Sequence, residues 1–206
     1  MAKKRAEKKK ERTVQEVISN IYRRSWDYIK SCRTYIYWAI IIFLLFFIFG
    51  FFIPAPADVQ TKILEYIQEL LSKTQGLSQT QLISFIFANN VQTAFESSLF
   101  GVVLGVFPAV ASISNGYLLG FVSVRVVQEE GVFVLWRLLP HGIFELPALF
   151  ISLGMGIKLG TFIFKKKKLQ TLREYLLRTA EVFIFVVVPL LFIAAIIEGS
   201  LISLLG

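Results

Sequence analysis

The chain has 206 residues, of which 55% are hydrophobic, and it contains 20 phenylalanines. Its mean hydropathy of +0.65 is far above that of a soluble domain and indicates an integral membrane protein. The net charge of +8 does not indicate nucleic-acid binding, because the basic cytosolic segments of a membrane protein account for it and no nucleic-acid motif is present.

Residues 1–34 are predicted to form a basic cytosolic head, because the first 33 contain eleven Lys and Arg against four acids. Thr13 to Glu16 has the pattern of a capping box that opens a helix. Its apolar residues recur at helical spacing: Val14, Val17, Ile18, Ile21, Tyr22 and Ile29. The basic residues beside this stripe are Arg23, Arg24, Lys30 and Arg33. We expect the head to lie on the membrane and bind anionic lipid headgroups, at about 1 kcal/mol for each basic residue. For Lys3 to Lys10, a role in topology alone is an equal alternative.

The first predicted span is Ile36 to Ile53, which holds no charged residue and is long enough to cross hydrocarbon. Tyr35, Tyr37 and Trp38 form an interfacial belt at one end, and Pro54 follows the other. The small residues around Pro56 resemble a signal-peptide cleavage site. However, the preceding region and the apolar segment are both longer than in a signal peptide, so we expect the segment to span the membrane.

Four further spans are predicted over residues 85–112, 116–127, 146–164 and 182–197. The predicted fold is therefore an all-α, polytopic transmembrane helical bundle of about five spans, which occupies residues 35–206. The second span is polar at its start and the third is short. These two could instead form one crossing and a re-entrant hairpin, which is tolerated where protein or water covers the backbone.

Two amphipathic helices are predicted outside the spans. Between Asp58 and Lys73 an apolar stripe consists of Val59, Ile63, Tyr66, Ile67, Leu70 and Leu71. This segment is expected to be an interfacial or docking helix that ends at Gly76. A weaker stripe between Leu169 and Arg178 predicts a surface helix that joins the last two spans.

Basic residues also predict the orientation. The head and the tetrad Lys165 to Lys168 belong in the cytosol. Five spans satisfy both requirements and place residues 58–81, residues 129–137 and the C-terminus outside. The expected location is the cell membrane, with a cytoplasmic N-terminus.

Small residues four apart predict close helix packing in three consecutive spans. The residues are Gly101, Gly105 and Ala109, then Gly116 and Gly120, then Ser152, Gly156 and Gly160. These contacts favour a compact bundle, and whether one such face binds a second copy of the chain is left open. The likeness of Gly116 to Gly120 and Gly156 to Gly160 hints at an internal repeat without establishing one.

Polar residues within the second span form one face of a helix, since Asn89, Thr93 and Glu96 fall at i, i+4 and i+7. Exposure of this face to lipid would cost several kcal/mol per unsatisfied group, so it must face protein or water. Hydrogen bonds that fix the register of the bundle are the favoured interpretation. A polar cavity for a solute or ion is the alternative.

The segment from Pro140 to Pro147 contains the chain's single histidine, His141, four residues before Glu145. Its prolines predict a break in regular helix on the outer side. Two ligands do not make a metal site, so a hydrogen bond between these side chains is favoured over metal binding. We also expect both to share a network with Asn89 or Asn90, which lie at a similar depth. The chain has no recognised catalytic set, and no enzyme activity or cofactor is predicted.

At these positions the chain resembles the stage II sporulation protein M family. The motifs that carry the resemblance are Phe87 to Asn90, Ala94-Phe95, Phe100-Gly101, Gly105, Asn115 to Gly120, Pro140 to Glu145 and Gly156 to Gly160. The resemblance implies a mostly five-span membrane protein with signature residues of no assigned chemistry: Asn89, Asn90, Asn115, Gly116, His141, Gly142 and Glu145. The family's namesake is a membrane scaffold that recruits peptidoglycan-degrading enzymes during engulfment, whereas relatives in organisms without spores have no settled role.

Two functions follow as expectations. A scaffold or assembly component with cell-envelope protein partners ranks slightly above a transporter or channel, and a membrane enzyme is a distant third. Access of water to the polar residues of the bundle would distinguish the scaffold from the transporter or channel. A cavity at Asn89, Glu96 and His141 that is open to one or both sides would favour transport, and mutual burial and bonding of these groups would favour a scaffold.

Overall fold

In the part of the chain that the computed structural model describes, every regular element is a helix. The description covers residues 2–133 and 139–205 for the backbone, and 15–133 and 142–204 for the side chains. The α-helices are α1 (Ala2–Phe52), α2 (Ala57–Thr74), α3 (Gln79–Leu99), α4 (Val106–Glu130), α5 (Leu139–Gly160), α6 (Lys168–Val182) and α7 (Val188–Leu205). Shorter helical segments include η1 (Phe100–Val102), η3 (Thr161–Phe164) and the π-helical η4 (Phe183–Val187). The predicted all-α class is confirmed.

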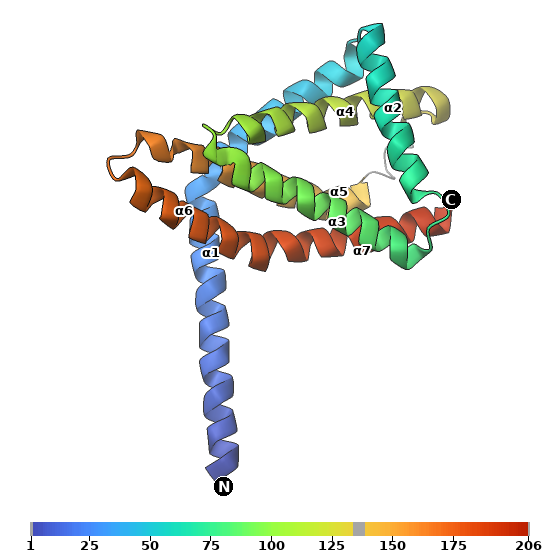
Figure 1. The fold of residues 1–206 in the computed structure, drawn as a ribbon. Helices are drawn as coiled ribbons and strands as arrows, with labels where there is room; N and C mark the ends of the chain where they lie inside the picture. The colour runs from blue at the N-terminus through green and yellow to red at the C-terminus, as the bar shows by residue number, and fades with distance from the viewer. Residues whose placement is uncertain (1, 134–138, 206) are drawn as a thin grey trace.

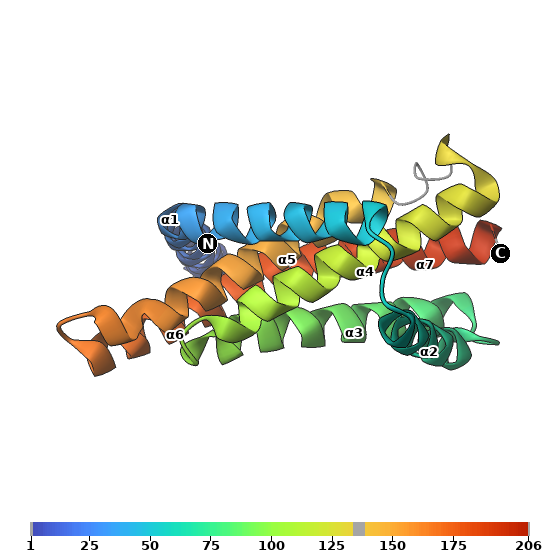
Figure 2. The same ribbon diagram turned by 90° about the horizontal axis from the view of Figure 1, so that it is seen from above.

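Five helices lie side by side in a bundle: the second half of α1, α3, α4, α5 and α7 (Figure 1). Figure 2 shows the same arrangement from above. One end of the bundle carries α2 and the C-terminus and is called the α2 end. The other carries Lys165 to Lys168 and is called the lysine end. Both α2 and the first half of α1 run across the bundle direction, at opposite ends.

Four helical stretches in the described part of the chain are long and apolar enough to cross a membrane. They are Gln15–Phe52, Val106–Glu130, Gly142–Phe164 and Lys168–Leu204. The more polar α3 does not meet this criterion, yet it lies in the bundle against α5 and α7. Membrane-length helices are thus confirmed, whereas the count of five crossings stays a prediction.

The seam between α1 and α4 is formed by small residues that bring the two backbones together. A Cβ atom on Gly116 would overlap the carbonyl oxygen of Phe43, and one on Gly120 would overlap that of Phe47. One turn earlier, the Ser112 hydroxyl donates a 2.7 Å hydrogen bond to the carbonyl oxygen of Ala39. The row Ser112, Gly116, Gly120 therefore fixes α4 along the second half of α1.

The centre of the bundle is α5, whose Leu153, Met155 and Leu159 are fully buried. Its glycines take part in the closest contacts. A Cβ atom on Gly156 would overlap the carbonyl oxygen of Ser97 on α3, and one on Gly160 would overlap the backbone of Gly105. Side chains larger than hydrogen at these positions would separate α5 from α3 and from the turn that precedes α4.

The predicted boundary between the second and third spans is wrong. The chain turns between α3 and α4 over residues 100–105, and α4 then runs without interruption through residues 112–116. Gly105 precedes α4 in the left-handed region at φ 69°, and Leu104 also has a positive φ of 56°. The expected membrane helix over 85–112 is therefore two helices. The chain leaves the helical conformation after Val102, and Gly105 adopts a left-handed conformation that favours glycine just before α4 begins.

Two further predicted breaks are absent. The helix α5 includes both Pro140 and Pro147. Pro140 is the second residue of α5, where the amide proton it lacks has no partner within the helix in any case. At the other end of the chain, α6 continues through η4 into α7, so the segment predicted as a separate surface helix is the start of the last long helix. Pro189 lies just after the π-helical segment, which accommodates its ring and its missing donor.

The head has no helix start at Thr13, because α1 already begins at Ala2. The same helix also passes the expected boundary between head and bundle at residue 34 without a break.

Candidate functional site: a polar cavity at the α2 end

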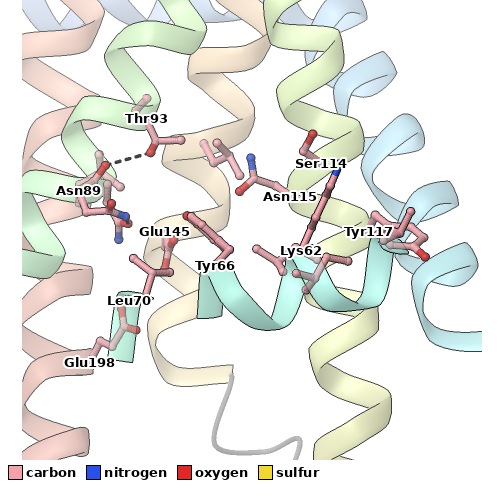
Figure 3. Close-up of a pocket in the computed structure, with 17 residues that line it drawn as sticks. Lys62, Tyr66, Leu70, Asn89, Thr93, Ser114, Asn115, Tyr117, Glu145 and Glu198 are labelled. Atoms are coloured by element: carbon pink, nitrogen blue, oxygen red, sulfur yellow. Dashed lines mark hydrogen bonds between the residues drawn. The ribbon is translucent and has the colours of Figure 1, made fainter. Parts of the chain in front are cut away.

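A cavity of about 810 Å³ lies between α2 and the bundle (Figure 3). Four bundle helices and α2 contribute to its wall. The polar side chains are Lys62 and Tyr66 from α2, Asn89, Asn90 and Thr93 from α3, Ser114, Asn115 and Tyr117 from α4, Glu145 from α5 and Glu198 from α7. Apolar residues such as Leu118, Leu149 and Leu191 complete it. A concave, partly apolar site with a few converging polar groups is typical of small-molecule binding.

The cavity exists because α3 and α4 diverge. They meet at the turn over residues 100–105 and separate toward the α2 end in both views (Figure 1, Figure 2). At the closed end, Gly101 lies against Gly156 of α5 and no side chain separates the backbones. Toward the open end, α5 contributes Glu145 and Leu149 to the cavity wall. The space between α3 and α4 thus has the shape of a wedge, and the small residues of the turn determine where this wedge is closed.

The helix α2 covers the cavity but packs loosely. None of its residues is buried, although Val59, Ile63 and Leu70 line the cavity. Among its contacts, the Gln60 side-chain amide donates to the carbonyl oxygen of Ala55 at 2.9 Å and accepts from the Arg125 guanidinium at 3.2 Å. Few buried apolar contacts are typical of an element that opens at low free-energy cost.

The exposed face of α2 carries a salt bridge between Lys73 and Glu69, with 2.7 Å between the ammonium nitrogen and the carboxylate oxygen. This hydrogen bond lowers the pKa of the Glu69 carboxyl. The pair lies one helical turn apart and supports α2 as a helix without filling the cavity.

Amide and hydroxyl groups of α3 and α4 lie on opposite walls. The Thr93 hydroxyl donates a 3.0 Å hydrogen bond to the carbonyl oxygen of Asn89, and the Asn89 amide lies 3.4 Å from the amide oxygen of Asn90. On the facing wall the Asn115 amide donates to the carbonyl oxygen of Ala111 at 2.8 Å. These bonds stay within one helix, so they hold the side chains in place without closing the space between the walls.

Both signs of charge are present. Figure 3 shows the carboxylates of Glu145 and Glu198 on the side of Asn89, whereas Lys62 lies toward Ser114 and Asn115. Charges at this depth of a helical bundle are costly in hydrocarbon and are normally found where water or a partner reaches them.

The structure brings only part of the predicted polar network together. Asn89, Asn90, Asn115 and Glu145 line one cavity. Glu96 does not join them, because its carboxylate is exposed on α3 and accepts a 2.9 Å hydrogen bond from Gln92.

The other predicted site residues have separate positions. Gly116 is buried against α1 on another face of α4. Gly142 is half-buried, and among the described residues a Cβ atom added to it would meet only the Leu146 side chain. The His141 side chain lies outside the described side chains, so its hydrogen bond to Glu145 and its place in a network remain predictions.

Sequence reasoning missed Glu198, Lys62 and Tyr66. An acidic residue inside the most apolar helix was a usable signal for Glu198, because such residues rarely face lipid. No comparable signal marked Lys62 and Tyr66, because charged and aromatic residues are common on the surface of any amphipathic helix. Among the side chains that the structure describes, no three His, Cys, Asp or Glu residues are grouped as a metal site would require.

Fold and site together define a helical membrane protein with a polar cavity among its membrane-length helices. The chain belongs to the stage II sporulation protein M family, whose model matches residues 39–201. This match confirms the resemblance that the motifs indicate. The matched range begins within α1 and ends within α7, so it includes every helix that lines the cavity.

The chain is also similar to an uncharacterized protein of Methanocaldococcus jannaschii, with 28% identity over 138 residues. The aligned region covers 65% of this chain and 61% of the relative, so the chain spans less than two thirds of that protein's length. No solved structure matches the chain. Neither the family description nor the name of this relative points to a catalytic activity.

Proposed function

We propose that the protein crosses the cell membrane five times and binds a small polar solute in a cavity that faces outward. The crossings are the second half of α1, α3, α4, α5 and α7. The head and the lysine end are cytosolic, and α2 and the C-terminus are outside, where α2 lies along the membrane surface over the cavity.

The observation that carries this proposal is the polar wall of the cavity. Four bundle helices direct amides, hydroxyls or carboxylates toward one space of about 810 Å³. A bundle held together only by packing would fill such a space with apolar side chains, because interiors are close-packed and each unpaired polar group costs free energy. Polar groups around an unfilled space are the arrangement that water and a solute require.

Positive charge at the lysine end supports the orientation. Lys165 to Lys168 are all exposed at that end, and the first half of α1 leaves the bundle there. Basic residues concentrate on the cytosolic side of membrane proteins. The cavity lies near the opposite end and would therefore open outward.

The amide, hydroxyl and carboxyl groups that line the cavity favour solute binding over the scaffold role. A scaffold requires partner surfaces, and it does not require carboxylates and amides around a cavity inside the bundle. The scaffold role of the family's namesake remains the alternative, and it would be favoured if the cavity were inaccessible from outside.

Thiol labelling in intact cells tests the proposal. Cys32 is the single cysteine, so a Cys32→Ser background allows one introduced thiol to be followed. We expect Asn115→Cys to react with a small, membrane-impermeant thiosulfonate and not with a maleimide attached to a large polymer. The matched control is Ile193→Cys, because Ile193 is 41% exposed on the outer surface of α7 and would face lipid.

A thiol in hydrocarbon does not ionise and hardly reacts, so the control should stay unlabelled by both reagents. Failure of the small reagent at Asn115→Cys, in a protein that is folded and inserted, would contradict the proposal and favour the scaffold.

A further inference from the structure

The first half of α1 forms an arm, defined here as residues 15–33, that leaves the bundle at the lysine end. Figure 1 shows it running across the direction of α7, and Figure 2 shows it nearly end-on. If α7 crosses the membrane, a helix in this direction runs along the membrane surface. This inference rests on the membrane placement in the proposed function but not on the cavity.

The base of the arm is fixed by polar contacts to α5. Lys158 is only 7% exposed, and its ammonium nitrogen donates a hydrogen bond to the Ser31 hydroxyl. The same nitrogen lies 4.3 Å from the ring centre of Tyr28 in the arm and 5.0 Å from that of Tyr175 in α6. Two aromatic faces around one ammonium group satisfy a charge that would otherwise be costly to bury.

Contacts to α6 hold the arm further along its length. The hydroxyls of Tyr28 and Thr179 are 3.3 Å apart, and the Arg24 guanidinium is 3.1 Å from the Glu181 carboxylate. Ser25 and Cys32 are also buried, so one face of the arm packs against the rest of the protein. The direction of the arm is therefore set by specific contacts and is not that of a free extension.

A second face of the arm is apolar and exposed. Ile18, Tyr22 and Trp26 follow one another at four-residue spacing and are 47%, 50% and 58% exposed. This row differs from the predicted stripe, because Ile21 and Ile29 are partly buried and Trp26 takes their place on the outside. The Tyr22 ring lies 6.5 Å from that of Phe185, which is exposed on the last long helix, so the row continues a surface that would face lipid.

Basic residues border this row. Arg23, Lys30 and Arg33 are all exposed, and the Lys30 ammonium lies 5.7 Å from the centre of the Trp26 ring. The wider head has eleven Lys and Arg against four acids in its first 33 residues. Exposed apolar residues beside a strong positive charge match the chemistry of a membrane that carries anionic headgroups.

We propose that the arm binds the cytosolic leaflet, with Ile18, Tyr22 and Trp26 inserted below the headgroups and the basic residues on anionic lipid. We infer that the arm binds lipid and not nucleic acid, because binding to nucleic acid would leave Ile18, Tyr22 and Trp26 exposed to water. Docking of a protein on this row is a different result that the test below can detect.

The test uses the full-length protein in lipid nanodiscs with Trp26 as the only tryptophan, obtained with Trp38→Phe and Trp136→Phe. One set of discs contains phosphatidylcholine alone, and the other also contains phosphatidylglycerol. In the anionic discs we expect quenching of Trp26 by lipids brominated in the acyl chain and a severalfold lower quenching constant for aqueous acrylamide. High salt should reverse part of this protection, because it screens the basic residues.

Two charge variants separate lipid binding from a general effect of charge. Arg23→Gln with Arg33→Gln should restore acrylamide quenching in anionic discs, whereas the matched pair Lys166→Gln with Lys167→Gln should not. Both pairs remove two exposed positive charges, so neither is expected to affect folding, which circular dichroism can verify. Equal acrylamide quenching in the two kinds of disc, or protection of Trp26 only when a soluble protein is added, would overturn the proposal. The cavity labelling does not depend on the arm, so the two proposals fail separately.

Discussion

The backbone of Gly101 lies directly on that of Gly156, so closely that a Cβ atom at Gly101 would overlap the carbonyl oxygen of Gly156. This contact joins the turn before α4 to the central helix α5 and closes the wedge between α3 and α4. At the other end of the wedge the same helices separate and leave the polar cavity. One close approach between two glycines thus joins the helices at the point where the cavity ends.

The first prediction concerns this contact. Gly156→Ala should destabilise the protein by about 1 to 3 kcal/mol, because the added methyl group would overlap the Ser97 carbonyl oxygen and contact Pro108. The thermal midpoint in detergent measures this effect. The control is Gly142→Ala in the same helix, where the new methyl group would meet, among the described residues, only the Leu146 side chain at 3.7 Å. If the two variants melt alike, the glycine contacts do not hold the bundle together.

The second prediction concerns the buried ammonium group of Lys158. Tyr28→Leu removes the ring beneath it, whereas Tyr28→Phe keeps the ring and loses only the hydroxyl. We expect the leucine variant to be less stable than the phenylalanine variant, by up to about 2 kcal/mol for a desolvated cation and ring. In a Lys158→Met background this difference should shrink, since no cation remains. An unchanged difference in that background would show that the ring contributes only packing.

The third prediction concerns the attachment of α2. Gln60→Leu removes the hydrogen bonds to Ala55 and Arg125, while the residue stays at a partly exposed position. Overall stability should change by no more than about 0.5 kcal/mol, as is usual for surface positions. Limited proteolysis between α1 and α3 should nevertheless become faster, because α2 loses its link to α4. The control is Gln68→Leu at an exposed position on the same helix, and equal proteolysis of both variants would show that Gln60 does not restrain α2.

The fourth prediction concerns topology. In a Cys32→Ser background, Lys166→Cys should react with an impermeant reagent only after the membrane is opened, and Ile202→Cys should react in intact cells. Both positions are exposed, at opposite ends of the bundle, so accessibility within the protein does not limit either reaction. Labelling of Lys166→Cys from outside would contradict the proposed five crossings.

The class of the fold could be predicted because apolar length and small-residue spacing act locally. The segment from Ile36 to Ile53 lies almost entirely in a long apolar helix, and Gly116, Gly120, Gly156 and Gly160 lie at close contacts between backbones. Both features depend on the local sequence, namely a run of apolar residues or the absence of a side chain. The turn before α4 could not be located in the same way. Gly101 and Gly105 fit a helix-packing motif equally well, and only the left-handed backbone at Gly105 shows that the chain reverses there.

The candidate site was predictable only where polar residues lie within the predicted membrane spans. Asn89, Asn90, Asn115 and Glu145 stand out on that basis, and they do line one cavity. Glu96 fits the same pattern, but its carboxylate is exposed on α3, near the closed end of the wedge. A helical repeat places these residues on one stripe without stating where along that stripe the neighbouring helices separate. The contribution of α2 depends on how the chain folds back after Pro56, which no local pattern encodes.

The most direct measurement of the central claim compares two thiols on the same face of α3. Thr93 lines the cavity, whereas Ser97, one turn further along, is 4% exposed and packs against Gly156 at the closed end. In intact cells with a Cys32→Ser background, a small impermeant reagent should label Thr93→Cys many times faster than Ser97→Cys. In inverted vesicles neither should react rapidly. Equal labelling of the two thiols from outside, or rapid labelling of Thr93→Cys from the cytosolic side alone, would contradict a cavity that opens outward and closes at the glycine contact.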